Sequence, residues 1–303
     1  MKHVFIINPI SGKGHALEFI GEIENYFKIN GGDYEIIKTE RISHATEIAK
    51  EYCKKYQEVT IYSVGGDGTM KEILDGIQEN AIMCVIPGGT GNDFYKSIDK
   101  RKSEIAQIVK DSIEGSIEYV DYGTLNGTSK FLNICSFGLD ADINLYACNE
   151  AKKNTNIPNS MVYAYSALKV GLHPSTYHMK GIVDGREIED EILLFAISNG
   201  KFYGGMFMPA PMADIQDGNL DVCYFKNKMT LLRIVHLILK YTKGKHLQEK
   251  ECEFFNAKKI ELSFDRTISY QIDGENGTLD HCVVEVHPKA MRLKVPKGRI
   301  INK

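Results

Sequence analysis

The chain has 303 residues, of which 43% are hydrophobic and 25% are charged, as is typical of a folded globular protein. At about 150 residues per domain, this length predicts two domains. The formal net charge of −3 argues against a general nucleic-acid binder, which needs a basic excess to compete for phosphates. The first apolar run, residues 4–7, is too short for a signal-peptide core or a membrane span. We therefore expect a cytoplasmic protein whose membrane contact, if it has one, is peripheral.

The cysteines and histidines form no short ligand or redox pattern. The seven cysteines are Cys53, Cys84, Cys135, Cys148, Cys223, Cys252 and Cys282, with no CxxC pair, and the histidines form no HxH or HExxH pattern. Reduced thiols in a cytosolic protein are therefore expected, rather than a metal or disulfide framework. His173 and His178 flank a candidate loop, and we expect surface or structural roles for both.

Strands and helices alternate in the first part of the chain. Apolar runs predict strands at residues 4–7, 34–38, 58–64 and 83–86, and helical spacing predicts helices at 16–27, 44–56 and about 69–78. Because the connections are short, this alternation predicts a doubly wound α/β domain.

After about residue 121 the sequence becomes β-rich. Short runs bounded by Gly, Asn or Asp predict strands at 131–135, 177–183, 191–198, 220–225, 259–264, 268–272, 282–286 and 291–295. Helices are expected at 141–152, 162–172 and 229–242. The predicted fold is therefore α/β followed by an antiparallel β-sandwich or barrel.

Three glycine-rich turns, at residues 8–14, 65–69 and 87–91, each follow an apolar strand. In an open α/β sheet such turns line up at the carboxyl ends of the strands, where ligands bind. Glycine lets backbone N–H groups close on an anion, and a helix N-terminus adds partial positive charge. Three such turns in one domain indicate a site for an extended phosphate chain.

Charged residues in these turns make the prediction more specific. Lys13 can offer its ammonium group to a phosphate oxygen. Asp67 and Asp93 would repel phosphate unless a cation lies between, so they indicate a magnesium nucleotide. The chain lacks GxxxxGK[ST] and a strict GxGxxG, which argues against a P-loop NTPase and a dehydrogenase.

The three turns closely resemble the signature turns of the diacylglycerol kinase catalytic-domain family, which includes bacterial lipid kinases and the sphingosine and ceramide kinases. The matching segments read NPISGKG at residues 8–14, GGDGTMKE at 65–72 and PGGTGNDF at 87–94, and the resemblance covers the whole chain in order. The GGDGT turn alone is also shared with the NAD kinase and 6-phosphofructokinase families.

The resemblance implies a nucleotide domain at residues 1–121, completed by a strand within about 290–303, and a β-sandwich lipid-substrate domain at 122–289. The active site would lie in the cleft between them. The activity implied is transfer of the γ-phosphate of ATP, with Mg²⁺, to a lipid hydroxyl at the inner face of the membrane. Diacylglycerol, phosphatidylglycerol, undecaprenol and a sphingoid base are all open as acceptors. Diacylglycerol, giving phosphatidic acid, is favoured because it is the commonest acceptor in the family.

The resemblance also assigns residues. The nucleotide-binding positions would be Asn8, Lys13, Gly66, Asp67, Gly68, Thr69, Glu72, Thr90, Gly91 and Asn92. Asp67, Asp93 and Asp121 match the acids that organise the Mg²⁺ and charged network. The family commonly has arginine at the position of Lys96, and lysine keeps the charge but cannot form a bidentate fork.

Two acid–glycine turns in the second part also resemble family motifs. Asp273 would be the general base that accepts the proton of the attacking hydroxyl, supported by Glu275. Without the family resemblance, the Asp-Gly pair indicates only a hairpin turn. Asp214, Asp217 and a carbonyl at Asn219 or the next residue would hold a structural Mg²⁺, the alternative being a turn without metal.

Other classes of function remain open. A kinase of a soluble hydroxyl compound, similar to NAD kinase, shares the GGDGT turn, and a nucleotide-sensing regulator could bind ATP without transferring phosphate. The basic stretch 226–245 is either a lipid-contacting amphipathic helix or, as we favour, a helix packed on the sandwich. A homodimer is a further open alternative.

Overall fold

The computed structural model of the chain describes residues 1–99, 101, 103–149 and 162–299. Its contacts divide the chain into two units. Unit 1 comprises Met1–Tyr122, Asp214–Gly218 and His287–Lys303, and unit 2 comprises Gly123–Ala213 and Asn219–Val286.

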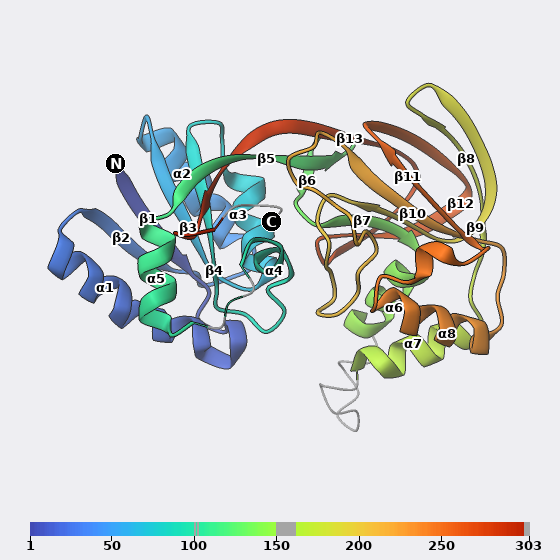
Figure 1. Ribbon diagram of the computed structural model, residues 1–303, viewed down its shortest axis with the longest axis horizontal. Helices are drawn as coiled ribbons and strands as arrows, with labels where there is room; N and C mark the ends of the chain where they lie inside the picture. Colours follow the sequence, from blue (N-terminus) through green and yellow to red (C-terminus); the bar gives the residue numbers. More distant parts are fainter. Residues whose placement is uncertain (100, 102, 150–161, 300–303) are drawn as a thin grey trace. The chain divides into compact units, whose positions relative to one another are not determined.

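Unit 1 is built on a parallel sheet. Its strands run in the order β4 (Ala81–Pro87), β3 (Val59–Gly65), β1 (Lys2–Ile7) and β2 (Asp33–Lys38), and the C-terminal part of β13 (Glu275–Val295) pairs with β4. Helices α1 (Phe19–Asn30) and α5 (Ile105–Ile113) cover one face, and α2 (His44–Lys55) and α3 (Asp67–Gly76) cover the other (Figure 1). Because both faces are covered, the central strands are apolar along most of their length.

The core of unit 1 follows from the alternation of side chains along the strands. Phe5 and Ile7 point to the same face and are fully buried there, and Phe5 stacks on Tyr62 with ring centroids 4.1 Å apart. Phe19, Ile23 and Phe27 recur every fourth residue in α1 and pack onto this face. The burial of these side chains fixes the ends of β1 and β3, from which two of the glycine turns begin.

Unit 2 is an antiparallel β-sandwich. Its strands are β6 (Ser129–Phe131), β7 (Ile134–Gly138), β8 (Tyr177–Val183), β9 (Arg186–Ser198), β10 (Leu220–Lys226), β11 (Cys252–Ala257), β12 (Lys259–Ile272) and the N-terminal part of β13; β5 (Ser116–Leu125) enters from unit 1. The long strands β9 and β12 each pair with both β7 and β8, so each of these long strands belongs to both layers of the sandwich. A register shift between Ser263 and Ile268 lets β12 change partners.

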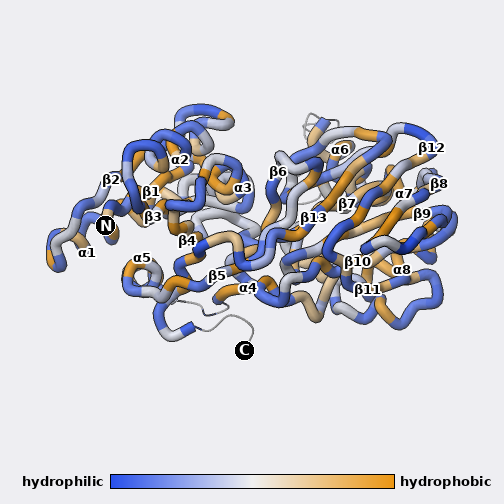
Figure 2. The backbone as a smooth tube through the Cα atoms, turned by 90° about the horizontal axis from the view of Figure 1, so that it is seen from above, coloured by the Kyte–Doolittle hydropathy of each residue, from blue (hydrophilic) through white to orange (hydrophobic). Residues whose placement is uncertain are grey.

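Short helices lie beside the strands of unit 2: α6 (Leu139–Asn149), α7 (Val162–Leu172), α8 (Leu231–Tyr241) and the 3₁₀ turn η4 (His246–Gln248). Hydrophobic stretches of β7, β9, β10 and β12 enclose the main core, and hydrophobic segments of the sandwich strands are drawn in orange in Figure 2. A second cluster lies between the β9–β10 face and α8.

The predicted order of an α/β domain followed by a β-sandwich is confirmed, with local differences. The expected strand 131–135 is two strands, β6 and β7, and the runs at 282–286 and 291–295 belong to one long strand, β13. Helices α4 (Asp93–Ile98) and α5 and strands β5 and β11 were not predicted. The end of the expected helix 141–152 and the last residues, 300–303, lie outside the described residues. Within the described ranges, no helix is long and apolar enough to cross a membrane.

Candidate active site

The three glycine turns meet at one edge of the unit 1 sheet. The Asn8 side-chain nitrogen donates to the Thr69 hydroxyl across 3.1 Å, which joins the first turn to the second. The Gly88 nitrogen donates to the Gly65 carbonyl at 2.9 Å, which joins the second turn to the third. A Cβ at Gly89 would lie 2.3 Å from the Gly66 Cα, so this approach requires glycine. The sequence predicted that these turns converge, and the structure brings them together.

The first turn has an unusual backbone that exposes a lysine. Gly12, Lys13 and Gly14 have φ values of 59°, 59° and 95°, a run of left-handed conformations that is costly for any residue but glycine. A Cβ at Gly12 would lie 2.5 Å from the Gly88 carbonyl oxygen, so the first turn also lies against the third. The Lys13 side chain is exposed beside these turns and can reach an anion there.

The acids of the second and third turns are held together. The Asp67 Oδ1 atom accepts hydrogen bonds from the backbone nitrogens of Asp93 (2.8 Å) and Phe94 (3.4 Å) at the start of α4. Burial, followed by the nearby Asp93 charge, raises the pKa of Asp67 from its ordinary 3.8 to about 6, against the opposing effect of these bonds. The two acids therefore form a charged site that a divalent cation would stabilise.

Lys96 compensates part of this charge. Its Nζ atom lies 2.8 Å from Asp93 Oδ1 and forms an ion pair with a carboxylate that is only 7% exposed. Lys96, at the position where the resemblance implies arginine, thus forms a salt bridge to Asp93 through a single donor in place of a fork.

The other residues expected to bind the nucleotide differ in exposure and in hydrogen bonding. Gly68 and Thr90 are exposed, and a Cβ at Gly68 would meet nothing within 4 Å, so this side of the turns is open. Asn92 instead closes its own turn through two hydrogen bonds with the Gly89 backbone, of 2.8 and 3.1 Å. Glu72 accepts a hydrogen bond from the Ala45 nitrogen at 3.2 Å, so its carboxylate faces the start of α2.

The aspartate loop at Asp214–Gly218 belongs to unit 1, although the sequence assigns it to the second domain. Asp121 is fully buried and holds the loop in place. Its two carboxylate oxygens accept hydrogen bonds from the nitrogens of Gly218 (2.7 Å) and Lys289 (2.6 Å), and its own nitrogen donates to Ile215. Asp121 is thus bonded to the aspartate loop, whereas the resemblance groups it with Asp67 and Asp93.

Magnesium would suit this loop by its chemistry. Burial raises the pKa of Asp121, and the nearby charges of Asp217 and Asp214 raise it further. Carboxylate and carbonyl oxygens are the ligands that Mg²⁺ prefers, and a cation would offset the repulsion among these acids. Asp214 Oδ1 already accepts a hydrogen bond from the Gln216 nitrogen at 2.8 Å, which shapes the loop. Asn219, the third expected ligand, begins the unit 2 segment that leads into β10.

Asp273 lies in a two-residue hairpin turn between β12 and β13. Asp273 and Gly274 have φ values of 45° and 93°, so both adopt the left-handed conformations of such a turn. The Asp273 carboxylate is buried and accepts hydrogen bonds from three consecutive backbone nitrogens, those of Leu132, Asn133 and Ile134, at 2.7 to 3.1 Å. The hairpin that Asp-Gly predicts is therefore present and carries a buried carboxylate, and Glu275 beside it is exposed.

Buried polar residues that the sequence analysis missed support this hairpin. The Gln271 side chain accepts a hydrogen bond from the Gly274 nitrogen (3.0 Å) and donates to the Ser136 hydroxyl (2.8 Å). Ser136 in turn donates to Asp140, and burial raises the pKa of Asp140 to about 7. These residues come from β12, β7 and α6, so no short sequence pattern connects them.

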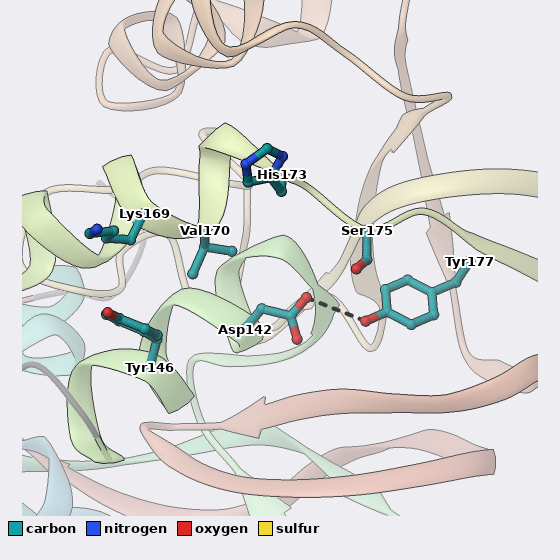
Figure 3. Close-up of a pocket in the computed structure, with 7 residues that line it drawn as sticks. All are labelled: Asp142, Tyr146, Lys169, Val170, His173, Ser175 and Tyr177. Carbon is teal, nitrogen blue, oxygen red and sulfur yellow. Dashed lines mark hydrogen bonds between the residues drawn. The ribbon is translucent and has the colours of Figure 1, made fainter.

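A pocket of about 370 Å³ lies in unit 2 between α6, the end of α7 and the start of β8 (Figure 3). It is lined by Asp142, Tyr146, Lys169, Val170, His173, Ser175 and Tyr177. The Tyr177 hydroxyl donates to Asp142 at 3.3 Å, and burial raises the pKa of Asp142. A carboxylate, a lysine and aromatic rings together suit a polar group attached to an apolar chain. His178, outside the pocket, is 2.9 Å from Glu189.

Comparison with known proteins covers both units. Residues 2–125 match the family model described as the diacylglycerol kinase catalytic domain, and residues 133–295 match the YegS C-terminal NAD kinase beta sandwich-like domain. A diacylglycerol kinase of Bacillus subtilis is 25% identical over 283 residues, which is 91% of each chain. A diacylglycerol kinase of Staphylococcus carnosus is 25% identical over 90% of this chain and 88% of its own.

Solved structures share the fold. A diacylglycerol kinase from Bacillus anthracis superposes with a TM-score of 0.72 at 22% identity, over 99% of this chain and 98% of the other. An NAD kinase from Archaeoglobus fulgidus, solved in complex with ATP, gives a TM-score of 0.55 at 12% identity, over 98% and 94% of the two chains.

Proposed function

Because the chain belongs to the diacylglycerol kinase catalytic-domain family of lipid kinases, we propose that it transfers the γ-phosphate of ATP to a lipid hydroxyl. The observation that carries this proposal is the contact of three glycine turns around Asp67 and Asp93 at one sheet edge. Diacylglycerol, with phosphatidic acid as the product, is the acceptor that we propose.

The geometry of the turns supports the nucleotide half of this proposal. Backbone N–H groups of the turns and the start of α3, with Lys13, would bind the phosphates of ATP. Asp67 and Asp93 would hold the catalytic Mg²⁺, which offsets the charge that develops on the transferred phosphoryl group. Lys96 keeps Asp93 in position through its ion pair. These residues therefore orient the γ-phosphate rather than react with it.

The acceptor half requires a group that takes the proton of the attacking hydroxyl. We assign this role to Asp273, whose buried carboxylate is held in place by hydrogen bonds from the backbone nitrogens of Leu132, Asn133 and Ile134. Because those bonds occupy both carboxylate oxygens of Asp273, the exposed Glu275 is the alternative base. Comparing Asp273→Asn with Glu275→Gln in a single-turnover assay separates the two. Loss of the chemical step in the Glu275 variant alone would overturn the assignment to Asp273.

The pocket beside α6 is a candidate site for the lipid headgroup. Asp142 lines this pocket, and Asn144, two residues further along α6, donates to the Asn276 side chain at 2.9 Å, next to the Asp273 turn. The same helix therefore contributes to the pocket and to the catalytic hairpin. Val170→Trp would fill the pocket, and we expect it to raise the KM for lipid while leaving the KM for ATP unchanged.

Exposed leucines support peripheral contact with a membrane. Leu232 and Leu239 of α8 are 84% and 59% exposed and lie on the same face as the exposed Val235. The cations of this helix are engaged with acids, since Arg233 contacts Glu249 and Glu251. The opposite face packs on the sandwich through Ile234 and Leu237, as favoured from the sequence. The exposed leucines, rather than the basic charges, would then enter the lipid.

One experiment tests both the activity and the acceptor. The purified chain is incubated with γ-labelled ATP and Mg²⁺ and offered diacylglycerol, phosphatidylglycerol, undecaprenol, a sphingoid base or NAD, and the products are identified by mass spectrometry. Label in phosphatidic acid is the expected result. Label only in NADP would support the soluble-acceptor alternative, and ATP binding without transfer to any acceptor would indicate a regulator.

A further inference from the structure

Two cysteines and a histidine that are remote in sequence converge in unit 2, and none of them belongs to the Asp273 hairpin. They are Cys223 on β10, His246 at the start of η4 and Cys252 at the start of β11. One ligand atom from each lies within 4.8 Å of the other two, and the two Sγ atoms are 3.6 Å apart. Cys223 and His246 are buried, and Cys252 is partly exposed, so the group can be reached from the surface.

The hydrogen bonding of His246 leaves one ring nitrogen available. The Nε2 atom lies 3.0 Å from the carbonyl oxygen of Pro209, which can only accept, so Nε2 carries the proton. The Nδ1 atom therefore holds a lone pair, and it is buried without a hydrogen-bond partner. An unsatisfied buried acceptor is unfavourable, and a bound ion would satisfy it.

The orientation of the ring is fixed by its neighbours. The Tyr241 ring lies edge-on to His246 with centroids 4.5 Å apart, and Phe225 packs at 6.0 Å. A histidine that binds a metal usually donates its other N–H to a carbonyl or carboxylate, which sets the tautomer and the ring plane. The bond from Nε2 to Pro209 has this form.

The spacing of the sulfur atoms fits a tetrahedral thiolate site. Zinc–sulfur bonds of about 2.3 Å at tetrahedral angles place two sulfurs roughly 3.8 Å apart. The observed separation of 3.6 Å is close to this value. Thiolate and imidazole ligands favour Zn²⁺ over Mg²⁺, which prefers oxygen. Among the described residues no other His, Cys, Asp or Glu joins this group, so a fourth position remains for water.

We propose that Cys223, Cys252 and His246 Nδ1 bind one Zn²⁺ ion, distinct from the magnesium chemistry of the kinase. Binding converts both thiols to thiolates, so each Zn²⁺ that enters releases two protons. The ion would tie η4 and the start of β11 to β10. Its effect is then on the stability of unit 2, independent of the proposed phosphate transfer.

Cobalt is the probe for this site. Metal-free, reduced full-length protein is titrated with Co²⁺, and we expect one equivalent to produce a thiolate-to-cobalt charge-transfer band that Zn²⁺ abolishes. Cys223→Ser, Cys252→Ser and His246→Asn should each weaken binding at least tenfold. Cys148→Ser, also partly exposed, and Cys282→Ala, also buried, are the matched controls and should bind normally. Circular dichroism of each variant checks its folding.

Two measurements on the unaltered chain make the test independent of whether the variants fold. X-ray absorption at the zinc edge should report two sulfur ligands and one imidazole, and a pH indicator should record two protons released per ion. A cobalt spectrum that persists in the Cys223→Ser, Cys252→Ser double variant would overturn the proposal. So would a Cys223–Cys252 disulfide in protein isolated with its other thiols reduced.

Discussion

The backbone nitrogen of Asp93 donates a hydrogen bond to the Asp67 carboxylate across 2.8 Å. The first residue of α4 is thereby tied to the first residue of α3, and two acids are held close together in a partly buried setting. This arrangement is unfavourable for the protein without its ligand, because burial and the second charge oppose ionisation of Asp67. Such a cost is expected at a site that is completed by a cation and a nucleotide.

The first prediction concerns the pH dependence of stability. Since the pKa of Asp67 is about 6 in the folded protein and 3.8 is its ordinary value, the unfolded chain loses this proton first. Stability should therefore fall as pH rises from about 4 through 6. Asp67→Asn should therefore raise the free energy of unfolding of the nucleotide-free protein at pH 8 by about 2–3 kcal/mol. This figure follows because each unit of the Asp67 pKa shift corresponds to ~1.4 kcal/mol. Urea unfolding at pH 4 and 8 measures this, with the exposed Glu24→Gln as control.

The same Asp67→Asn variant should lose phosphate transfer, because the proposed cation site loses a charge. A variant with full activity would exclude Asp67 from that site. Equal stability of the variant and the unaltered protein at both pH values would contradict the burial argument instead.

The second prediction separates two glycines of the turns. Gly89→Ala should destabilise unit 1 by about 1–3 kcal/mol, because its Cβ would overlap the Gly66 backbone. Gly68→Ala meets no protein atom within 4 Å, so it should retain stability and lose ATP affinity. Thermal unfolding and calorimetric ATP titration distinguish these outcomes.

Gly21→Ala, in helix α1 with open space around it, is the control for both glycine variants. It should raise stability by about 0.5–1 kcal/mol, as glycine-to-alanine changes in helices do, without affecting ATP. Weakened ATP binding by this control would show that the assay reports general disturbance of unit 1.

The third prediction tests the ion pair of Lys96. Lys96→Met removes the cation beside Asp93 and also a charge that lowers the pKa of Asp67. The acidic limb of the pH–rate profile should then move to higher pH, with a severalfold loss of kcat at pH 7. Lys96→Arg should restore both properties, since it returns the charge. An unchanged profile in the methionine variant would show that the pair is not used in catalysis.

The fourth prediction concerns the carboxylate of Asp273. Asparagine offers one acceptor oxygen in place of two, so Asp273→Asn leaves part of the Leu132–Ile134 backbone unsatisfied. We expect a loss of about 1–3 kcal/mol in the free energy of unfolding. The exposed Glu275→Gln change should stay within about 0.5 kcal/mol. Equal effects of the two substitutions on unfolding would contradict the structural role of the buried carboxylate.

The fifth prediction concerns membrane contact. The double change Leu232→Asp and Leu239→Asp should reduce cosedimentation with vesicles of anionic phospholipid at least tenfold, because the charges oppose insertion. Ile29→Asp, on α1 of unit 1 and 73% exposed, is the matched control and should bind as before. A loss of binding in high salt with intact leucines would point to the basic residues instead.

Much of the fold could be read from local patterns. The central strands of unit 1 are apolar along most of their length because helices cover both faces, and β8 and β10 lie within one residue of their predicted ends. Strand β11 and helix α5 were not predicted, although Ile105, Val109 and Ile113 recur at helical spacing in α5. The aspartate loop was assigned to the wrong unit, because its partners Asp121 and Lys289 are remote in sequence.

The sequence by itself determined the order of the elements and the three glycine turns, because glycine and aspartate act through local conformation and chemistry. The tertiary structure alone decided that Asn8 bonds to Thr69, that three nitrogens around Asn133 enclose Asp273, and that Cys223 meets Cys252. Those contacts join residues that are 29 to 141 positions apart, and they form only when burial of the strands brings their ends together.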